Sequence, residues 1–407
     1  MKKEISASRV SIIALVAILL TAINMRGAVT SLSPLVSDIQ ESLHLSTTAV
    51  GLLGMIPTAA FAVAALVSPR ALRVFTVAQT LALASVVTAV GIVVRVLGPS
   101  TALLFAGSVL ALIAIGITNA VVPIAVRAFF PQRVPLLSTL YLLSMQVGMT
   151  AAPALAIPLE NAAAEHGFAQ PWRYSLAAWA IPALVAGVSW LPLVRLPRSG
   201  AARAAAERKT TVPVYRTKVG IGLAAMFGMT SFTSYTMMMF LPSMYMDGGA
   251  SRDFAALMLS VWSGAGLLVA FIGPWIIGRF EKPYPFVVLF LVLFLVGNYG
   301  IAFAPMSAPW LWVILSGLGP ATFAMALTLI NVRARSFAGA TAMSAFGQGA
   351  GYTVACLGPF LVGLLKDVTS GWLAPTVATT IALIIVGIGG YFATRPVYVE
   401  DQLPAGA

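Results

Sequence analysis

Long apolar runs restrict the fold of this chain more than any other feature. Twelve such runs follow one another along the 407 residues, and each has the length of a bilayer-spanning helix. They are too long for the short alternating strands of an outer-membrane barrel. The runs lie near 10–37, 47–68, 75–97, 101–126, 134–159, 172–195, 216–246, 254–278, 284–305, 309–332, 339–365 and 372–394. Only 9% of residues are charged, against about 25% in soluble domains, so we predict an all-α membrane protein with 12 transmembrane helices.

The basic residues indicate how the chain lies in the membrane. Most of the 24 Lys and Arg residues fall on one side of the predicted spans if the N-terminus is inside. The outer side holds Arg95, Arg173, Arg252 and Lys366. This positive-inside bias predicts a multi-pass protein of the bacterial cytoplasmic (inner) membrane with both termini cytoplasmic. The net charge of +12 therefore reflects topology, and no nucleic-acid partner is expected.

The spans form two sets of six that resemble each other. A basic stretch at 195–217 separates an N-terminal bundle, 1–194, from a C-terminal bundle, 218–407. Matching features recur about 200 residues apart: basic turns (Arg70 and Arg73; Arg279 and Lys282) and Gln-Gly helices (Gln146 and Gly148; Gln348 and Gly349). Such repeats are typical of secondary transporters, whose substrate site lies near the midplane between the halves. We therefore predict the major facilitator fold, with two pseudo-symmetric six-helix bundles.

Arg26 is the leading candidate for substrate binding. It is the sole charge between Arg9 and Asp38, about 25 Å and 18 Å away along a continuous helix. An arginine inside the bilayer costs about 2.5–3.5 kcal/mol, so it must face protein, water or a ligand. The alternative is a structural role, in which Arg26 pairs with backbone carbonyls or with Asn119.

The segment around Arg26 resembles the cyanate and nitroimidazole porter family of the major facilitator superfamily. Asn24-Met25-Arg26 and Thr30-Ser31 match its pattern, whereas Gly27 stands where that family usually has proline. Further stretches agree in order: 117–133, 140–148, 172–184, 326–335 and 345–367. The resemblance implies a transporter for a small solute such as cyanate, a small linear anion.

Other polar residues inside the spans complete the predicted site. They are Asn24, Thr30, Asn119, Gln146, Tyr235, Gln348 and Tyr352. An unpaired polar group is costly in a span, so each needs a partner or a ligand. For Gln146, Gln348 and Tyr352, an interhelical hydrogen bond is an equally good explanation. Consecutive methionines at 237–239 cannot share one helix face, so at most two of them line a cavity.

The carboxylates are expected to lie outside the spans. Asp and Glu residues occur at 4, 38, 41, 160, 165, 207, 247, 253, 281, 367, 400 and 401. No buried group that titrates near neutral pH is then expected, which disfavours a carboxylate proton relay. Two mechanisms remain. The protein is a facilitator or exchanger, or a proton travels with the substrate. Arg95, near the outer end of the third span, is expected to snorkel to the headgroups, or to collect anions.

The leading function is transport of a small anion, such as cyanate, or of a related nitrogen-containing solute by alternating access. The alternative is an efflux permease for small aromatic or drug-like compounds such as nitroimidazoles, which the methionines favour. A membrane enzyme needs acidic or histidine clusters that the sequence lacks, so no enzymatic activity is expected. A sensor or scaffold is disfavoured because no soluble domain is appended. Cys356 is the sole cysteine, so neither a disulfide nor a cysteine-based metal site is predicted. No cofactor is expected, and the architecture predicts a monomer in the lipid bilayer.

Overall fold

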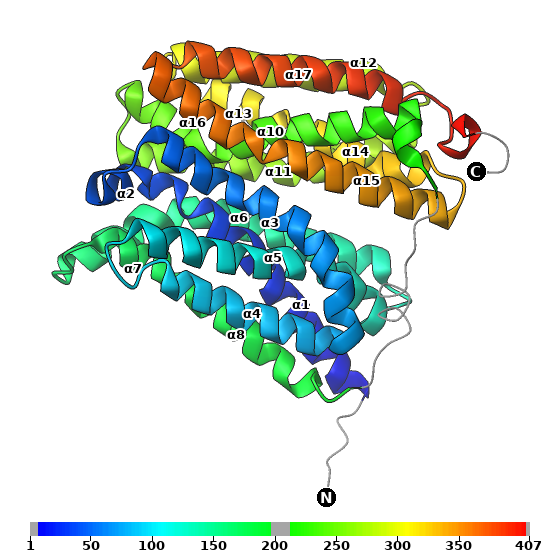
Figure 1. The fold of residues 1–407 in the computed structure, drawn as a ribbon, viewed down its shortest axis with the longest axis horizontal. Helices are drawn as coiled ribbons and strands as arrows, with labels where there is room; N and C mark the ends of the chain where they lie inside the picture. Colours follow the sequence, from blue (N-terminus) through cyan, green and yellow to red (C-terminus); the bar gives the residue numbers. More distant parts are fainter. Residues whose placement is uncertain (1–6, 197–211, 404–407) are drawn as a thin grey trace, which may run out of the picture. The chain divides into compact units, whose positions relative to one another are not determined.

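Helices make up most of the part of the chain that the structure describes. The computed structural model describes residues 7–196 and 212–403, and no strand occurs in these ranges. The first half holds α1 (Ala7–Thr30), η1 (Ser33–Leu35), α2 (Val36–Leu43), α3 (Thr47–Val74), α4 (Val77–Val94), α5 (Thr101–Phe129), α6 (Val134–Glu165), α7 (Pro171–Ala178), α8 (Ala180–Trp190) and η2 (Leu191–Leu193). The second half holds η3 (Val214–Arg216), α10 (Lys218–Asp247), α11 (Arg252–Arg279), α12 (Tyr284–Phe303), α13 (Pro309–Leu318), α14 (Ala321–Val332), α15 (Phe337–Ala355), α16 (Leu357–Thr369), α17 (Leu373–Ala393) and η4 (Glu400–Gln402) (Figure 1). Residues 197–211 of the predicted linker lie outside the described ranges.

Several predicted spans are interrupted. The span predicted at 10–37 is not one helix, because α1 ends at Thr30. Pro34 has no amide hydrogen to continue the helical ladder onto the Thr30 carbonyl, and a short 3₁₀ turn follows instead. The predicted span at 309–332 divides before Pro320 for the same reason. Two further spans divide at Trp179 and Cys356, into α7 with α8 and α15 with α16.

Hydropathy identifies eleven helical segments in the described ranges that are long and apolar enough to cross a membrane. The sequence predicts twelve spans, and α10 is absent from the eleven although it has 30 residues. Its stretch 230–236, TSFTSYT, lowers the hydropathy of an otherwise apolar helix. The twelfth helix is thus present but unusually rich in hydroxyl groups.

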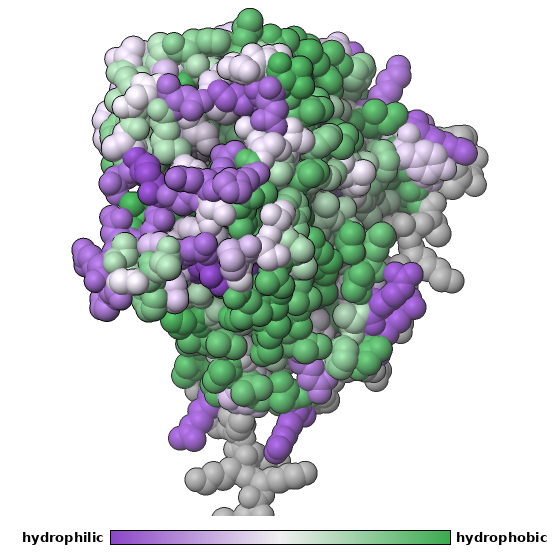
Figure 2. All heavy atoms as spheres, turned by 60° about the vertical axis from the view of Figure 1, so that its left-hand side comes forward, coloured by the Kyte–Doolittle hydropathy of each residue, from purple (hydrophilic) through white to green (hydrophobic). Residues whose placement is uncertain are grey.

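Exposed apolar side chains follow helical spacing. On α17, Ile381, Ile384 and Ile388 are each more than half exposed. Figure 2 shows broad hydrophobic areas, with hydrophilic residues gathered mainly at the left of the view. Exposed apolar faces of this extent suit contact with lipid tails rather than with water.

Two compact units make up the fold. The first comprises Met1–Asp38 and Val63–Arg208, and the second comprises Ile39–Ala62 and Lys209–Ala407. In the first unit α4 packs on α5 and α8, and α1 packs on α6 and α8. In the second unit α10 packs on α15 and α17. The bundle boundaries that the sequence predicts, 1–194 and 218–407, describe topology and stay a prediction.

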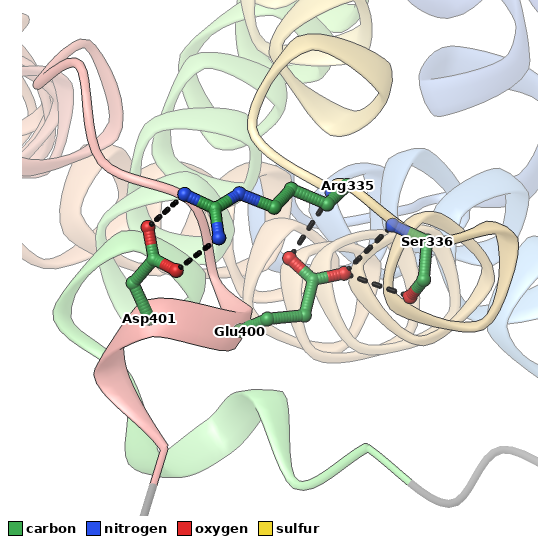
Figure 3. Close-up of polar contacts among 4 residues, drawn as sticks. All are labelled: Arg335, Ser336, Glu400 and Asp401. Carbon is green, nitrogen blue, oxygen red and sulfur yellow. Dashed lines mark hydrogen bonds and ion pairs between the residues drawn. The ribbon is translucent and has the colours of Figure 1, made fainter.

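The C-terminal segment of the second unit makes polar contacts with the turn between α14 and α15. Arg335 forms a bidentate ion pair with Asp401, at 2.9 Å and 3.0 Å (Figure 3). The Glu400 carboxylate accepts hydrogen bonds from the amide groups of Arg335 and Ser336 and from the Ser336 hydroxyl, at 2.8–3.1 Å. Partial burial alone would raise the pKa of Glu400, but these hydrogen bonds lower it below its ordinary value. Glu400 thereby caps the N-terminus of α15, where a negative charge is favourable.

Candidate functional site

The predicted residues of the first unit lie near the end of α1. Arg26 is half-buried and precedes the end of α1 by four residues, about 6 Å, so it does not lie in the middle of a long helix. Asn24 and Thr30 are buried. The C-terminal end of a helix carries partial negative charge, so this position stabilises an arginine.

A close crossing of α1 and α6 fixes this region. A Cβ atom on Gly148 would lie 2.8 Å from the Ile23 carbonyl carbon, so the two main chains are in direct contact. The Thr30 hydroxyl group lies 3.2 Å from both the Arg26 and the Met149 carbonyl oxygens, as a hydrogen-bond donor. Gln146 precedes Gly148 by two residues on α6. We call Asn24, Arg26, Thr30 and Gln146 the α1–α6 site.

Gly27 has a clear packing role beside this site. A Cβ atom there would lie 2.7 Å from two ring carbons of Trp179, between α7 and α8. The indole ring thus occupies the space that a larger residue at position 27 would need. Gly27, which stands where the family pattern usually has proline, leaves this space to the indole ring.

The polar groups of the α1–α6 site differ in how they are satisfied. The Asn24 Oδ1 atom is buried and accepts no hydrogen bond in the described ranges. Gln146 Nε2 lies 3.8 Å from the Met149 sulfur, a weak acceptor. Asn119 of α5 is half-buried. The Asn24 oxygen is the clearest site for a ligand or water donor.

The predicted residues of the second unit belong to an aromatic cluster. The Phe61 ring makes edge contacts with Tyr352 and Tyr235, at centroid distances of 5.6 Å and 6.5 Å. Phe227 contacts Tyr352 at 5.0 Å and Phe323 at 4.7 Å. Sequence reasoning selected the two tyrosines because they carry polar groups. It missed the phenylalanines, which are common in any apolar span.

Gln348 and the three consecutive methionines lie in the second unit. Gln348 Nε2 donates to Ser344 Oγ of the same helix at 2.8 Å. Met237, Met238 and Met239 are all buried. Met237 lines a small cavity in the second unit, together with Asn298 of α12 and Trp372. The expectation of an interhelical hydrogen bond for Gln348 is therefore not met by this contact, which lies within α15.

Two expectations about charged residues are wrong. Glu160, expected at the end of a span, is 6% exposed within α6, because this helix continues to Glu165. A buried carboxylate is thus present, and the case against a proton-carrying acid is weakened. Arg95, expected to snorkel to headgroups, is 1% exposed. In the described ranges, no group of three His, Cys, Asp or Glu side chains gathers to hold a metal ion.

The fold and the site together define a class of protein. The chain forms two helical units with exposed apolar faces and with polar groups beside close helix crossings. This combination is typical of a multi-pass membrane transporter. The Major Facilitator Superfamily model matches residues 14–363, and the chain belongs to that superfamily.

Relatives and solved structures agree with this assignment. The chain is 29% identical to the "Cyanate transport protein CynX" of Escherichia coli over 88% of this chain and 91% of that protein. It is 28% identical to the "2-nitroimidazole transporter" of Escherichia coli over 94% of this chain and 96% of that protein. The fold matches a bacterial homologue of the human lysosomal transporter Spinster, with a TM-score of 0.76, 16% identity and full coverage of both chains. The resemblance to the cyanate and nitroimidazole porter family is thereby confirmed.

Proposed function

We propose that this secondary transporter carries a small anion, such as cyanate, across the bacterial cytoplasmic membrane by alternating access. Arg26 would be the central binding residue, and this charge on an apolar helix is the observation that carries the proposal. A guanidinium group is charged at every physiological pH and presents its donors in a planar fork. The relation to a cyanate transport protein supports the same class of substrate.

The surroundings of Arg26 suit a small ligand. Thr30 and the crossing at Gly148 hold the main chain of α1, so the arginine is presented from a fixed backbone. Asn24 adds a buried amide whose oxygen has no partner in the described ranges. A linear anion of three atoms needs few contacts, and partial desolvation strengthens each of them.

A second candidate function follows from the aromatic cluster. Tyr235, Tyr352 and Phe61 offer ring faces and edges for an aromatic solute, and one relative is a 2-nitroimidazole transporter. Export of a small aromatic compound would use these rings and would depend less on Arg26. The two functions therefore differ in which substitution abolishes transport.

Uptake of radiolabelled cyanate into proteoliposomes tests the proposal. We expect saturable uptake by the wild type, with loss in Arg26→Gln and retention in Arg70→Gln, which removes an equal charge at an exposed position. An imposed pH gradient shows whether a proton accompanies the anion. Glu160→Gln shows whether the buried acid carries it. No cyanate flux, with saturable flux of 2-nitroimidazole that needs Tyr235, would replace the proposal with the alternative.

A further inference from the structure

Arg95 is held firmly in the interior of the first unit. It caps the C-terminus of α4, where its amide group donates to the Gly91 carbonyl at 3.0 Å. Its main chain presses against Gly107 of α5, where a Cβ atom would lie 2.6 Å from the Arg95 Cα. With 1% of the residue exposed, the guanidinium group is buried within the protein and does not reach the headgroups in this structure.

The hydrogen bonds of this guanidinium group are incomplete. Its Nη1 donates to the Ala28 carbonyl at 3.3 Å, two residues after Arg26. Its Nε and Nη2 atoms are buried and have no partner in the described ranges. None of the carboxylates in those ranges forms an ion pair with it. A buried charge without a counter-charge is unfavourable, and its unmade hydrogen bonds add to that.

Arg173 provides a comparison at the same end of the unit. Its Nε donates to the Val96 carbonyl at 2.8 Å, its Nη2 donates to the same oxygen, and its Nη1 donates to Gln170 Oε1 at 3.2 Å. All three nitrogens of Arg173 therefore have acceptors, although Arg173 is less buried than Arg95. Arg95 therefore lacks hydrogen-bond acceptors that Arg173 has.

Other buried donors without partners lie on the elements that meet here. Ser31 follows α1 three residues after Ala28, and Ser108 follows Gly107 on α5. The indole Nε1 of Trp172, next to Arg173, also has no partner in the described part of the chain. Arginine and indole groups can only donate, so the missing ligand must accept hydrogen bonds. The C-termini of α1 and α4 offset part of the charge but provide no acceptor for Nε or Nη2.

We propose that Arg95 is the basic residue of a second anion site, which binds a small monovalent inorganic anion. Complete burial requires the anion to be small, and one unpaired guanidinium group balances one negative charge. An anion accepts hydrogen bonds from these donors and brings no donor group that would itself need a partner. A water molecule would bring its own O–H groups. This site is on a different helix from Arg26 and does not require Arg26 to bind substrate.

Anion-dependent thermal unfolding of the purified protein tests this site. Chloride, which is not the substrate proposed for Arg26, replaces gluconate at constant ionic strength, and the midpoint temperature is followed. We expect a saturable rise for the wild type, Arg173→Gln and Arg26→Gln, and no saturable rise for Arg95→Gln. If Arg95→Gln does not fold, Arg95→Lys should fold and require about tenfold more anion for half of the rise, because lysine lacks the planar fork.

Two results would overturn the site. One is a saturable rise of equal midpoint concentration in the wild type and in the Arg95 variants. The other is a wild type whose unfolding temperature does not respond to chloride. Because Arg26→Gln keeps the response at Arg95, loss of cyanate transport in that variant is distinguishable from failure of the second site.

Discussion

The crossing of α1 and α6 gives a quantitative prediction for Gly148→Ala. The added Cβ atom would lie 2.8 Å from the Ile23 carbonyl carbon, whereas an ordinary carbon–carbon contact is about 3.7 Å. The Ile23 carbonyl oxygen is nearer still, so the helices would have to separate by at least about 1 Å, which would also break the hydrogen bond from Thr30 to Met149. Overpacking costs about 1–3 kcal/mol, against a gain of about 1 kcal/mol from replacing glycine by alanine in a helix.

Gly349 provides the matched control, because it is also helical and a Cβ atom there would meet nothing within 4 Å. Gly349→Ala should raise the unfolding temperature and keep cyanate uptake. Gly148→Ala should lower the unfolding temperature and reduce uptake about tenfold or more, because Arg26 is displaced. Both quantities are measured on protein in detergent and in proteoliposomes. Equal unfolding temperatures for the two variants would refute the reasoning.

Three further predictions follow from single contacts. Gly27→Ala should destabilise the protein by about 1–3 kcal/mol, and Trp179→Ala should relieve part of this loss in a double-mutant cycle; additive effects would contradict the contact. Glu400→Gln should lower the unfolding temperature at pH 7 by the equivalent of about 1 kcal/mol, the usual value of a cap. Because folding lowers the pKa of Glu400, the stabilisation by its carboxylate is complete above the ordinary carboxyl range and is lost as the pH falls through the folded pKa. The unfolding temperatures of the wild type and Glu400→Gln should therefore converge in acid. A difference that stays constant with pH would contradict this. Asp38→Asn should keep most cyanate uptake, because Asp38 lies half-exposed on the short helix α2; its abolition would show that this acid takes part in transport.

The sequence predicts the helices and the class of protein because hydropathy and charge asymmetry act over whole spans. It also selects Tyr235 and Tyr352, which the structure brings to one aromatic cluster through Phe61. The breaks at Trp179 and Cys356 follow the rule that ends α1, since Pro182 and Pro359 stand four residues after Ala178 and Ala355, the last residues of α7 and α15. Hydropathy alone does not register these breaks. Other prolines lie inside α6 without ending it, so a proline by itself does not tell which span divides.

The burial of two charged residues could not be predicted from the sequence. Arg95 and Glu160 lie near the ends of predicted spans, where a long side chain usually reaches water. Arg95 is buried where Gly107, which has no Cβ atom, allows α5 to press against it. Nothing in the local sequence of α4 reports this contact.

Equilibrium binding of cyanate to the purified protein tests the role of Arg26 most directly. Calorimetric titration should give saturable binding to the wild type, and Arg26→Lys should weaken it about tenfold or more, since lysine keeps the charge without the planar fork. The unfolding temperature of the variant, measured without anion, should match the wild type. A dissociation constant that is equal in the two proteins would contradict the account, because Arg26 would then not contact the anion.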